Sequence, residues 1–202
     1  MRIVVLVEGA TEMAFKEKLN EFLRDRLAGK LPRMVFQGGG GRIPTGDRLR
    51  KHVQNLFVGN NAANVVIALT DVYTGTREFK DAADAKAKMK AWVGAEPRFY
   101  PHVAQYDFEA WLLPFWSTIQ KLAKHNKHAP PGPPESVNHD RPPARRIQEI
   151  FQLGGCRDSY NKPRDAKRIL KENDLLVSAN KCPELKSFLN TILSVCGGEL
   201  IP

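Results

Sequence analysis

The sequence has no long hydrophobic run and few cysteines. No apolar stretch approaches the roughly 18 residues that a membrane-spanning helix requires. The apolar stretch "VVLV" near the N-terminus is too short for the hydrophobic region of a signal peptide, and no small-residue cleavage site follows it. Cys156, Cys182 and Cys196 are odd in number and lack metal-binding spacing. We therefore expect a cytoplasmic protein without a membrane segment, whose cysteines are small buried hydrophobic residues.

Positive charge, by contrast, is in excess. The chain has 31 Lys and Arg residues against 22 Asp and Glu residues, which gives a net charge of +9. Twelve of these basic residues and five of the acidic residues lie between Lys121 and Lys171, so this segment alone carries +7. Such a concentration indicates a polyanionic partner, and nucleic acid is the expected one. A basic face that is only solvated would have the same composition.

Short β-branched runs alternate with amphipathic helical patterns in the first half of the chain. We expect four strands, at Arg2–Val7, Met34–Gln37, Asn64–Thr70 and Arg98–Gln105. Helical patterns fill the intervals, at Thr11–Ala28, Asp47–Val58 and Arg77–Val93. This alternation predicts an α/β fold with a mostly parallel sheet and helices on both faces.

The pattern changes after the fourth strand. A helix is expected over Asp107–Lys124, broken near Pro114, and the proline-rich stretch His128–Pro143 cannot form regular structure. Three further helices are expected, at Ala144–Phe151, Arg164–Glu172 and Pro183–Val195. We therefore divide the chain into an α/β core (residues 1–123) and a basic helical cap (residues 124–202), packed together as one domain.

Acidic residues lie where the predicted strands end. Glu8 directly follows the first strand, Asp71 follows the third, and Asp107 and Glu109 follow the fourth. Glu12 lies in the first turn of the helix after the first strand, at the same edge of the sheet. Close carboxylates repel one another unless a cation neutralises them. Oxygen ligands without His or Cys favour Mg²⁺ or Mn²⁺, so we expect a metal site at this edge.

Two features near this edge allow a second interpretation. Glu12 is equally well placed for a favourable interaction with a helix N-terminus. The stretch Gly38–Arg48, "GGGGRIPTGDR", lacks the Gly-Lys-Ser/Thr end of a P-loop, and we favour a flexible turn over a substrate loop. Arg42 within this stretch is still a candidate phosphate contact. Glu8 has no obvious structural use, because it is a charge at the exit of a buried strand.

Four short motifs occur in order along the chain. They are "VEGATE" (Val7–Glu12), "TDVY" (Thr70–Tyr73), "FEAWLL" (Phe108–Leu113) and "YNKP" (Tyr160–Pro163). Together they resemble a family of bacterial proteins of unknown function related to TOPRIM domains, among them the TOPRIM domain of overcoming-lysogenisation-defect nucleases. The resemblance covers nearly the whole chain, from Arg2 to about Val195. It implies a four-stranded, mostly parallel TOPRIM-like sheet flanked by helices, with a C-terminal helical cap.

The resemblance also implies roles for the acidic residues of the core. Glu8 matches the TOPRIM glutamate that holds metal and acts as a general acid or base. Glu12 matches a second glutamate that the nuclease branch adds for a second metal. Asp71 matches the first aspartate of the TOPRIM Asp-x-Asp motif. The second aspartate of that motif is Tyr73 here, so one ligand is lost.

Residues of the second half are expected to complete this site. Glu109, helped by Asp107, would restore the missing charge, and Lys162 is the candidate cation that faces the scissile phosphate. The expected substrate contacts are Arg42, Tyr73, Tyr160, Lys162 and Arg164.

The activity that the resemblance implies is metal-dependent phosphodiester hydrolysis of nucleic acid in defence against phage. Mg²⁺ or Mn²⁺ would be the cofactor, and an ABC-type ATPase would be a further partner. The basic segment would bind the phosphate backbone without base specificity. Two alternatives stay open. Tyr73 in place of aspartate favours a non-catalytic module that binds nucleic acid or an ATPase, and a basic tail that closes a pocket would suit an enzyme of small nucleotides.

Overall fold

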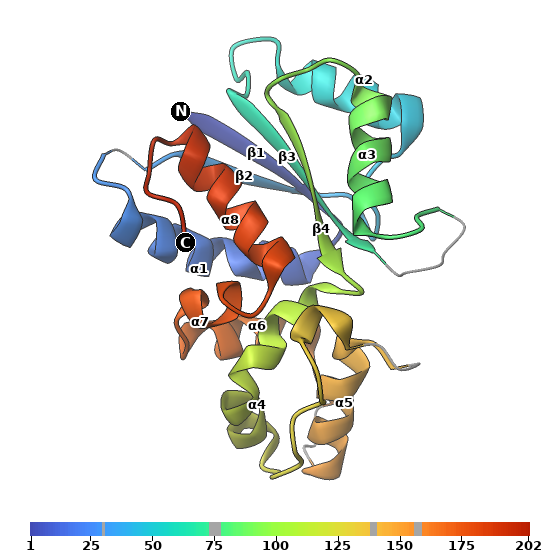
Figure 1. Cartoon of the computed structure of the whole chain (residues 1–202), viewed down its shortest axis with the longest axis vertical. Helices are drawn as coiled ribbons and strands as arrows, with labels where there is room; N and C mark the ends of the chain where they lie inside the picture. The colour runs from blue at the N-terminus through green and yellow to red at the C-terminus, as the bar shows by residue number, and fades with distance from the viewer. Residues whose placement is uncertain (30, 73–77, 138–140, 156–158) are drawn as a thin grey trace.

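A four-stranded parallel sheet forms the centre of the molecule (Figure 1). The computed structural model describes residues 1–29, 31–72, 78–137, 141–155 and 159–202. The strands are β1 (Arg2–Val7), β2 (Arg33–Gly38), β3 (Val65–Val72) and β4 (Phe99–Gln105), in the order β2-β1-β3-β4. All four predicted strands are present. The third strand continues to Val72, so Asp71 is the second-last residue of the strand. The prediction that Asp71 follows the strand is therefore wrong.

Side chains of the two central strands alternate between two hydrophobic clusters. Ile3, Val5 and Val7 of β1 pack into one cluster, whereas Val4 and Leu6 pack into the other. Both sets are almost inaccessible to solvent. A continuous apolar run is what a central parallel strand requires, since helices cover both of its faces.

Two pairs of helices cover the sheet, one pair on each face (Figure 1). Helices α1 (Ala10–Arg26) and α8 (Pro183–Val195) lie on one face, and α2 (Gly46–Leu56) and α3 (Ala82–Val93) lie on the other. Helix α3 begins at Ala82 because the side chain of Asp81 accepts a hydrogen bond from the backbone N of Asp84 at 2.8 Å. The prediction of an earlier start is wrong for the described residues, and Arg77 lies outside them.

The remaining elements follow β4. They are η1 (Phe108–Phe115), α4 (Trp116–Ala123), η2 (Pro134–Ser136), α5 (Pro143–Leu153), α6 (Lys162–Lys171) and α7 (Leu175–Ala179). The predicted helix over Asp107–Lys124 is a 3₁₀-helix in its first half, and Pro114 lies inside that half. The proline-rich stretch contains the short 3₁₀ turn η2, and α5 starts on Pro143, a residue suited to a first helical turn. Helix α7 was not predicted.

The helices of the second half share a core with the sheet. Trp111 of η1 packs against Phe15 of α1 and Phe188 of α8, with ring centroids 6.1 and 6.0 Å apart. All three side chains belong to one buried cluster that also contains Val5 and Val7. Helices α4 and α5 extend past the end of β4, whereas α6 packs beside α1 (Figure 1). The carboxyl edge of the sheet therefore faces the second half of the chain.

Two expectations from the sequence concern the burial of the cysteines and the presence of a membrane-spanning helix. Cys182 is fully buried and Cys196 is partly buried, while Cys156 lies outside the described residues. No helix in the described ranges combines the length and the hydrophobicity needed to cross a lipid bilayer.

Candidate active site

The connections of the sheet reverse direction between β1 and β3. From β1 the chain moves outward to β2, then returns across β1 to β3 on the other side. In open parallel sheets, ligands bind at the carboxyl ends of the strands where this reversal occurs. Glu8, which directly follows β1, and Asp71, the second-last residue of β3, both lie at this point.

Strand β3 holds the carboxylate of Glu8. The Thr70 hydroxyl donates a hydrogen bond to Glu8 Oε1, and the backbone N of Asp71 donates a second one to the same oxygen at 3.0 Å. Burial raises the pKa of the Glu8 carboxyl, these two hydrogen bonds oppose the rise, and the negative charge of Glu12 adds to it. Glu8 is therefore positioned by its neighbours, and its charge is only partly compensated.

The pKa of Asp71 is affected by all the other acidic side chains of the site. Burial raises the pKa of Asp71 well above its usual range, and the negative charges of Glu8, Glu12, Asp107 and Glu109 raise it further. Thr70, like Val66 and Ala68, faces α2 and α3, so the alternation of the strand turns Asp71 toward α1 and the second half of the chain. Asp71 thus lies within electrostatic reach of the other four acidic residues that the sequence singles out.

Glu12 has the structural role that the sequence allows. Its Oε2 accepts a hydrogen bond from the backbone N of Gly9 at 3.1 Å, in the first turn of α1, and its side chain is buried. The negative charge of Glu12 still raises the pKa of Glu8, Asp71 and Glu109. The helix-terminal role and the ligand role are therefore compatible in one residue.

Asp107 and Glu109 are the most deeply buried acids of the site, with 0% and 1% of their surface exposed. Asp107 Oδ2 accepts a hydrogen bond from the backbone N of Ala144, in the first turn of α5, at 3.1 Å. The preceding residue, Tyr106, adopts a left-handed conformation with φ of 68°, which is uncommon for a residue other than glycine. This turn directs the chain from β4 into η1, and sequence reasoning missed it.

The carboxylate of Glu109 is contacted on both oxygens by residues near the start of α6. The Tyr160 hydroxyl donates to Oε1 at 3.3 Å, and Lys162 Nζ donates to Oε2 at 3.3 Å. Burial raises the pKa of Glu109, and the charge of Lys162 opposes this rise. Burial and the Glu109 charge hold the pKa of Tyr160 well above its usual range. Burial tends to lower the pKa of Lys162, but Glu109 and Asp107 outweigh it and raise that pKa.

Arg42 lies at the rim beside Glu8. The backbone N of Gly41 donates to the carbonyl O of Glu8 at 2.8 Å, so the glycine-rich loop is attached to the end of β1. Gly40 and Gly41 have φ of 70° and 108°, values that favour glycine. The Arg42 side chain is 84% exposed, and its positive charge lowers the pKa of Glu8. Its guanidinium lies 3.9 Å from the carboxylate of Glu78, a long contact between two exposed side chains that an anionic ligand near Glu8 would compete with.

The other predicted substrate contacts have different surroundings. The guanidinium of Arg164 pairs with both oxygens of Asp165, each at 3.0 Å, and so helps to neutralise a fully buried acid. Tyr73 lies outside the described residues. Part of the basic segment is likewise matched by acids: Lys121 pairs with Glu172 at 2.9 Å and Lys127 with Glu149 at 2.6 Å.

The donor set suits a hard divalent cation. The acidic residues supply only carboxylate oxygens, which Mg²⁺ and Mn²⁺ prefer. Burial, with a smaller contribution from neighbouring acids, raises the pKa values of Glu8, Asp71 and Glu109, and a bound cation would favour their ionised forms. Within the described ranges, no three His, Cys, Asp or Glu side chains are grouped closely enough to hold a metal ion. The residues therefore suit a cation in chemistry and charge, although the described side chains are not arranged as a closed site.

A family model described as "Domain of unknown function (DUF4276)" matches residues 7–193. The chain belongs to this family. The match confirms the resemblance to a family of unknown function that the four motifs indicate. No curated protein matches the chain by sequence.

Solved structures similar to this DUF4276 chain come from OLD proteins. The C-terminal region of the Burkholderia pseudomallei OLD protein superposes with a TM-score of 0.57 at 13% identity, over 96% of this chain and 98% of that one. The C-terminal region of the Xanthomonas campestris pv. campestris OLD protein, phased with iodine, gives 0.50 at 14% identity, over 97% and 96%. At this identity the likeness shows the fold alone, and it confirms the predicted TOPRIM-like architecture.

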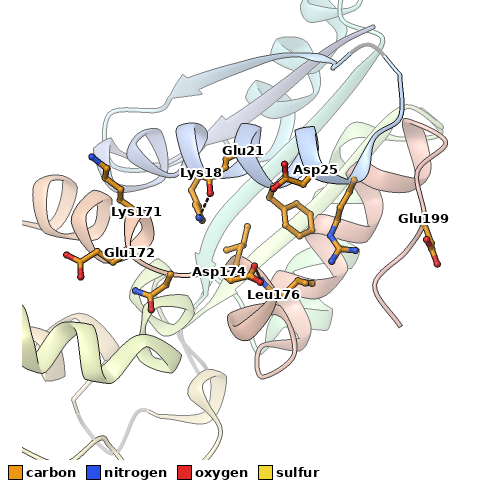
Figure 2. A pocket seen from close by; sticks show the side chains of 12 residues that line it. Lys18, Glu21, Asp25, Lys171, Glu172, Asp174, Leu176 and Glu199 are labelled. Atoms are coloured by element: carbon orange, nitrogen blue, oxygen red, sulfur yellow. Dashed lines mark hydrogen bonds and ion pairs between the residues drawn. The ribbon is translucent and has the colours of Figure 1, made fainter.

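A cavity of about 680 Å³ lies elsewhere on the molecule (Figure 2). Side chains of both charge signs line it, among them Lys18, Glu21, Asp25 and Lys171. The α1 residues that line the cavity begin at Lys18. They therefore lie further along the helix than Glu12, at a rise of roughly 1.5 Å per residue. None of the site's acidic residues lines it.

Proposed function

We propose that this protein is a metal-dependent phosphodiesterase that acts on nucleic acid. The observation that carries the proposal is that Asp71, at the reversal point of a parallel sheet, lies within electrostatic reach of Glu8, Glu12, Asp107 and Glu109. A cluster of this kind is costly for a folded protein, and a bound divalent cation offsets the cost. The fold shared with the C-terminal region of OLD proteins supports the same class of activity.

Glu8, Glu12, Asp71 and Glu109 would hold one or two Mg²⁺ or Mn²⁺ ions, with Asp107 adding negative charge behind them. A divalent cation bound there supplies Lewis acidity toward a phosphate oxygen. We assign metal binding to the carboxylates as a group, because the charges of the other four acids all raise the pKa of Asp71.

The chain's own residues bind and orient the substrate. Arg42 lies on the open side of Glu8, where it would neutralise a phosphate of the backbone. Lys162, which contacts Glu109, would meet the reacting phosphate and stabilise its developing negative charge. Glu8, fixed by Thr70 and the Asp71 amide, would accept a proton from the attacking water.

The wider setting follows from charge and from the resemblance. The net charge of +9 suits a polyanion bound through its backbone, without base readout. We propose cytoplasmic nucleic acid as the target, an ABC-type ATPase as a partner, and defence against phage as the biological role.

Nicking of supercoiled plasmid in Mn²⁺ or Mg²⁺ tests the proposal. The wild-type protein should convert plasmid to the nicked form, EDTA should abolish the reaction, and Glu8→Gln should reduce it by at least about a hundredfold. Glu17→Gln is the matched control, because Glu17 lies on α1 and pairs with Lys167 on the surface. If Glu8→Gln cleaves as well as the wild type, the assignment fails.

A non-catalytic binding module is the second candidate. Two observations favour it: no closed metal-holding group is formed among the described residues, and Lys162 already neutralises Glu109. This candidate predicts that the protein shows no heat of Mn²⁺ binding at millimolar concentration, while it still binds DNA or RNA in a gel-shift assay.

A further inference from the structure

The position of Lys162 is unfavourable for the helix that carries it. Lys162 is the first residue of α6, directly after Asn161, whose side chain caps the helix by accepting from the backbone N of Arg164 at 3.1 Å. A cation is disfavoured at a helix N-terminus, because the partial charge there is already positive. Helix stability therefore does not explain a lysine here, and its contact with Glu109 does.

The contact between Lys162 and Glu109 joins a buried acid to a half-exposed base. The Glu109 side chain is 1% exposed and the Lys162 side chain is 48% exposed. The 3.3 Å between Nζ and Oε2 is longer than the roughly 2.8 Å of a strong charge-assisted hydrogen bond. Lys162 can thus leave Glu109 for solvent without unpacking the core, whereas Glu109 cannot move away.

Charges beyond Glu109 also act on Lys162. Asp107 and Asp71 both raise its pKa, so the ammonium lies in the field of the same cluster that would attract a divalent cation. One positive charge near these carboxylates lowers the repulsion among them, and a divalent cation would do the same more completely. A divalent cation at these carboxylates would therefore compete with Lys162 for the same negative charge.

We propose that Lys162 is a resident counter-cation which a divalent metal ion displaces from Glu109. This inference rests on the proposed function, since it takes the carboxylates as the metal site. Without metal, the Lys162 ammonium neutralises Glu109 and keeps the acidic cluster compact. With metal bound, Glu109 would hold the cation without leaving its buried position, and the half-exposed ammonium of Lys162 would be released toward solvent, where it could meet a phosphate. Metal binding thereby prepares the contact with substrate.

Metal affinity measured without substrate tests the inference. In calorimetric titrations with MnCl₂, Lys162→Met should bind Mn²⁺ at least about fivefold more tightly than the wild type, because the competing charge is gone. Lys167→Met is the matched control: Lys167 lies on the same helix and pairs with Glu17 at 2.6 Å, so it changes the net charge equally away from Glu109. This control should keep wild-type affinity.

Thermal unfolding gives a second readout. The rise in melting temperature from EDTA to saturating Mn²⁺ should be larger for Lys162→Met than for the wild type, since ligand stabilisation grows with affinity. If Lys162→Met does not fold in EDTA, Lys162→Gln replaces it in both measurements. Equal or weaker Mn²⁺ binding by the variant overturns the counter-cation and leaves the metal site standing. Absence of binding by the wild type overturns the metal site itself, and the counter-cation with it.

Discussion

Replacement of Asp71 by asparagine should make the metal-free protein more stable. Asp71 is partly buried among four other acids, and burial together with the charges of Glu8, Glu12, Asp107 and Glu109 disfavours its ionised form. Asparagine has nearly the same shape but no charge. The substitution therefore removes four repulsive interactions and part of a desolvation penalty, without creating a cavity.

The size of the effect follows from these four interactions. Pairs of charges near a protein surface contribute about 0.2–1 kcal/mol each, so four repulsive pairs correspond to a gain of about 1–4 kcal/mol in the free energy of unfolding. For a chain of this length, 1 kcal/mol shifts the melting temperature by about 2–4 °C. Calorimetric melting in EDTA at pH 7.5 should thus show a rise of several degrees.

Asp84 supplies a control of opposite sign. Its carboxylate accepts hydrogen bonds from the backbone N of Lys80 at 2.8 Å and from Lys88 Nζ at 2.7 Å, and these contacts lower its pKa. Asp84→Asn should therefore destabilise the protein. A melting temperature for Asp71→Asn that is equal to or below the wild-type value would refute the idea that the acidic cluster is under electrostatic strain.

Three further predictions concern other residues. Burial and the charge of Lys86 lower the pKa of His102 from 6.5 to about 4. As the pH falls between these values, His102 is protonated in the unfolded chain but stays neutral in the native state, so the native state loses stability. Urea unfolding should show a loss of about 3 kcal/mol between pH 6.5 and 4, and His102→Gln should remove this loss. Glu135→Ala should cost about 1–3 kcal/mol in the same assay, because the carboxylate accepts from Trp111 Nε1 at 2.9 Å and from backbone amides at the start of α8. Thr70→Val should lower the plasmid-nicking rate about tenfold with little change in melting temperature, because it removes a donor that orients Glu8; an unchanged rate would show that this hydrogen bond has no positioning role.

The strands and the edge that carries the site were predictable from the sequence. Continuous apolar runs define β1 and β3, and parallel strands place their carboxyl ends on the same edge. The positions of Glu8 and Asp71 near this edge follow from that geometry alone. Thr70 could also have been predicted as a partner of Glu8, since alternation along β3 places it on the face opposite to Asp71.

The pairing of Glu109 with Lys162 was not predictable in this way. The two residues are 53 positions apart, and their contact depends on how α6 packs against η1. The left-handed conformation of Tyr106 has no signal in its residue type, because glycine or asparagine is the usual choice there. The role predicted for Arg164 did not consider that Asp165, its neighbour in the chain, binds its guanidinium.

Calorimetric titration of MnCl₂ into the wild-type protein and into Glu8→Gln tests the central claim most directly. If the converging carboxylates form a cation site, the wild type should bind Mn²⁺ saturably at millimolar concentration or below, and Glu8→Gln should weaken this binding by at least about tenfold. Absence of saturable binding by the wild type, or equal affinity in the two proteins, would contradict the claim.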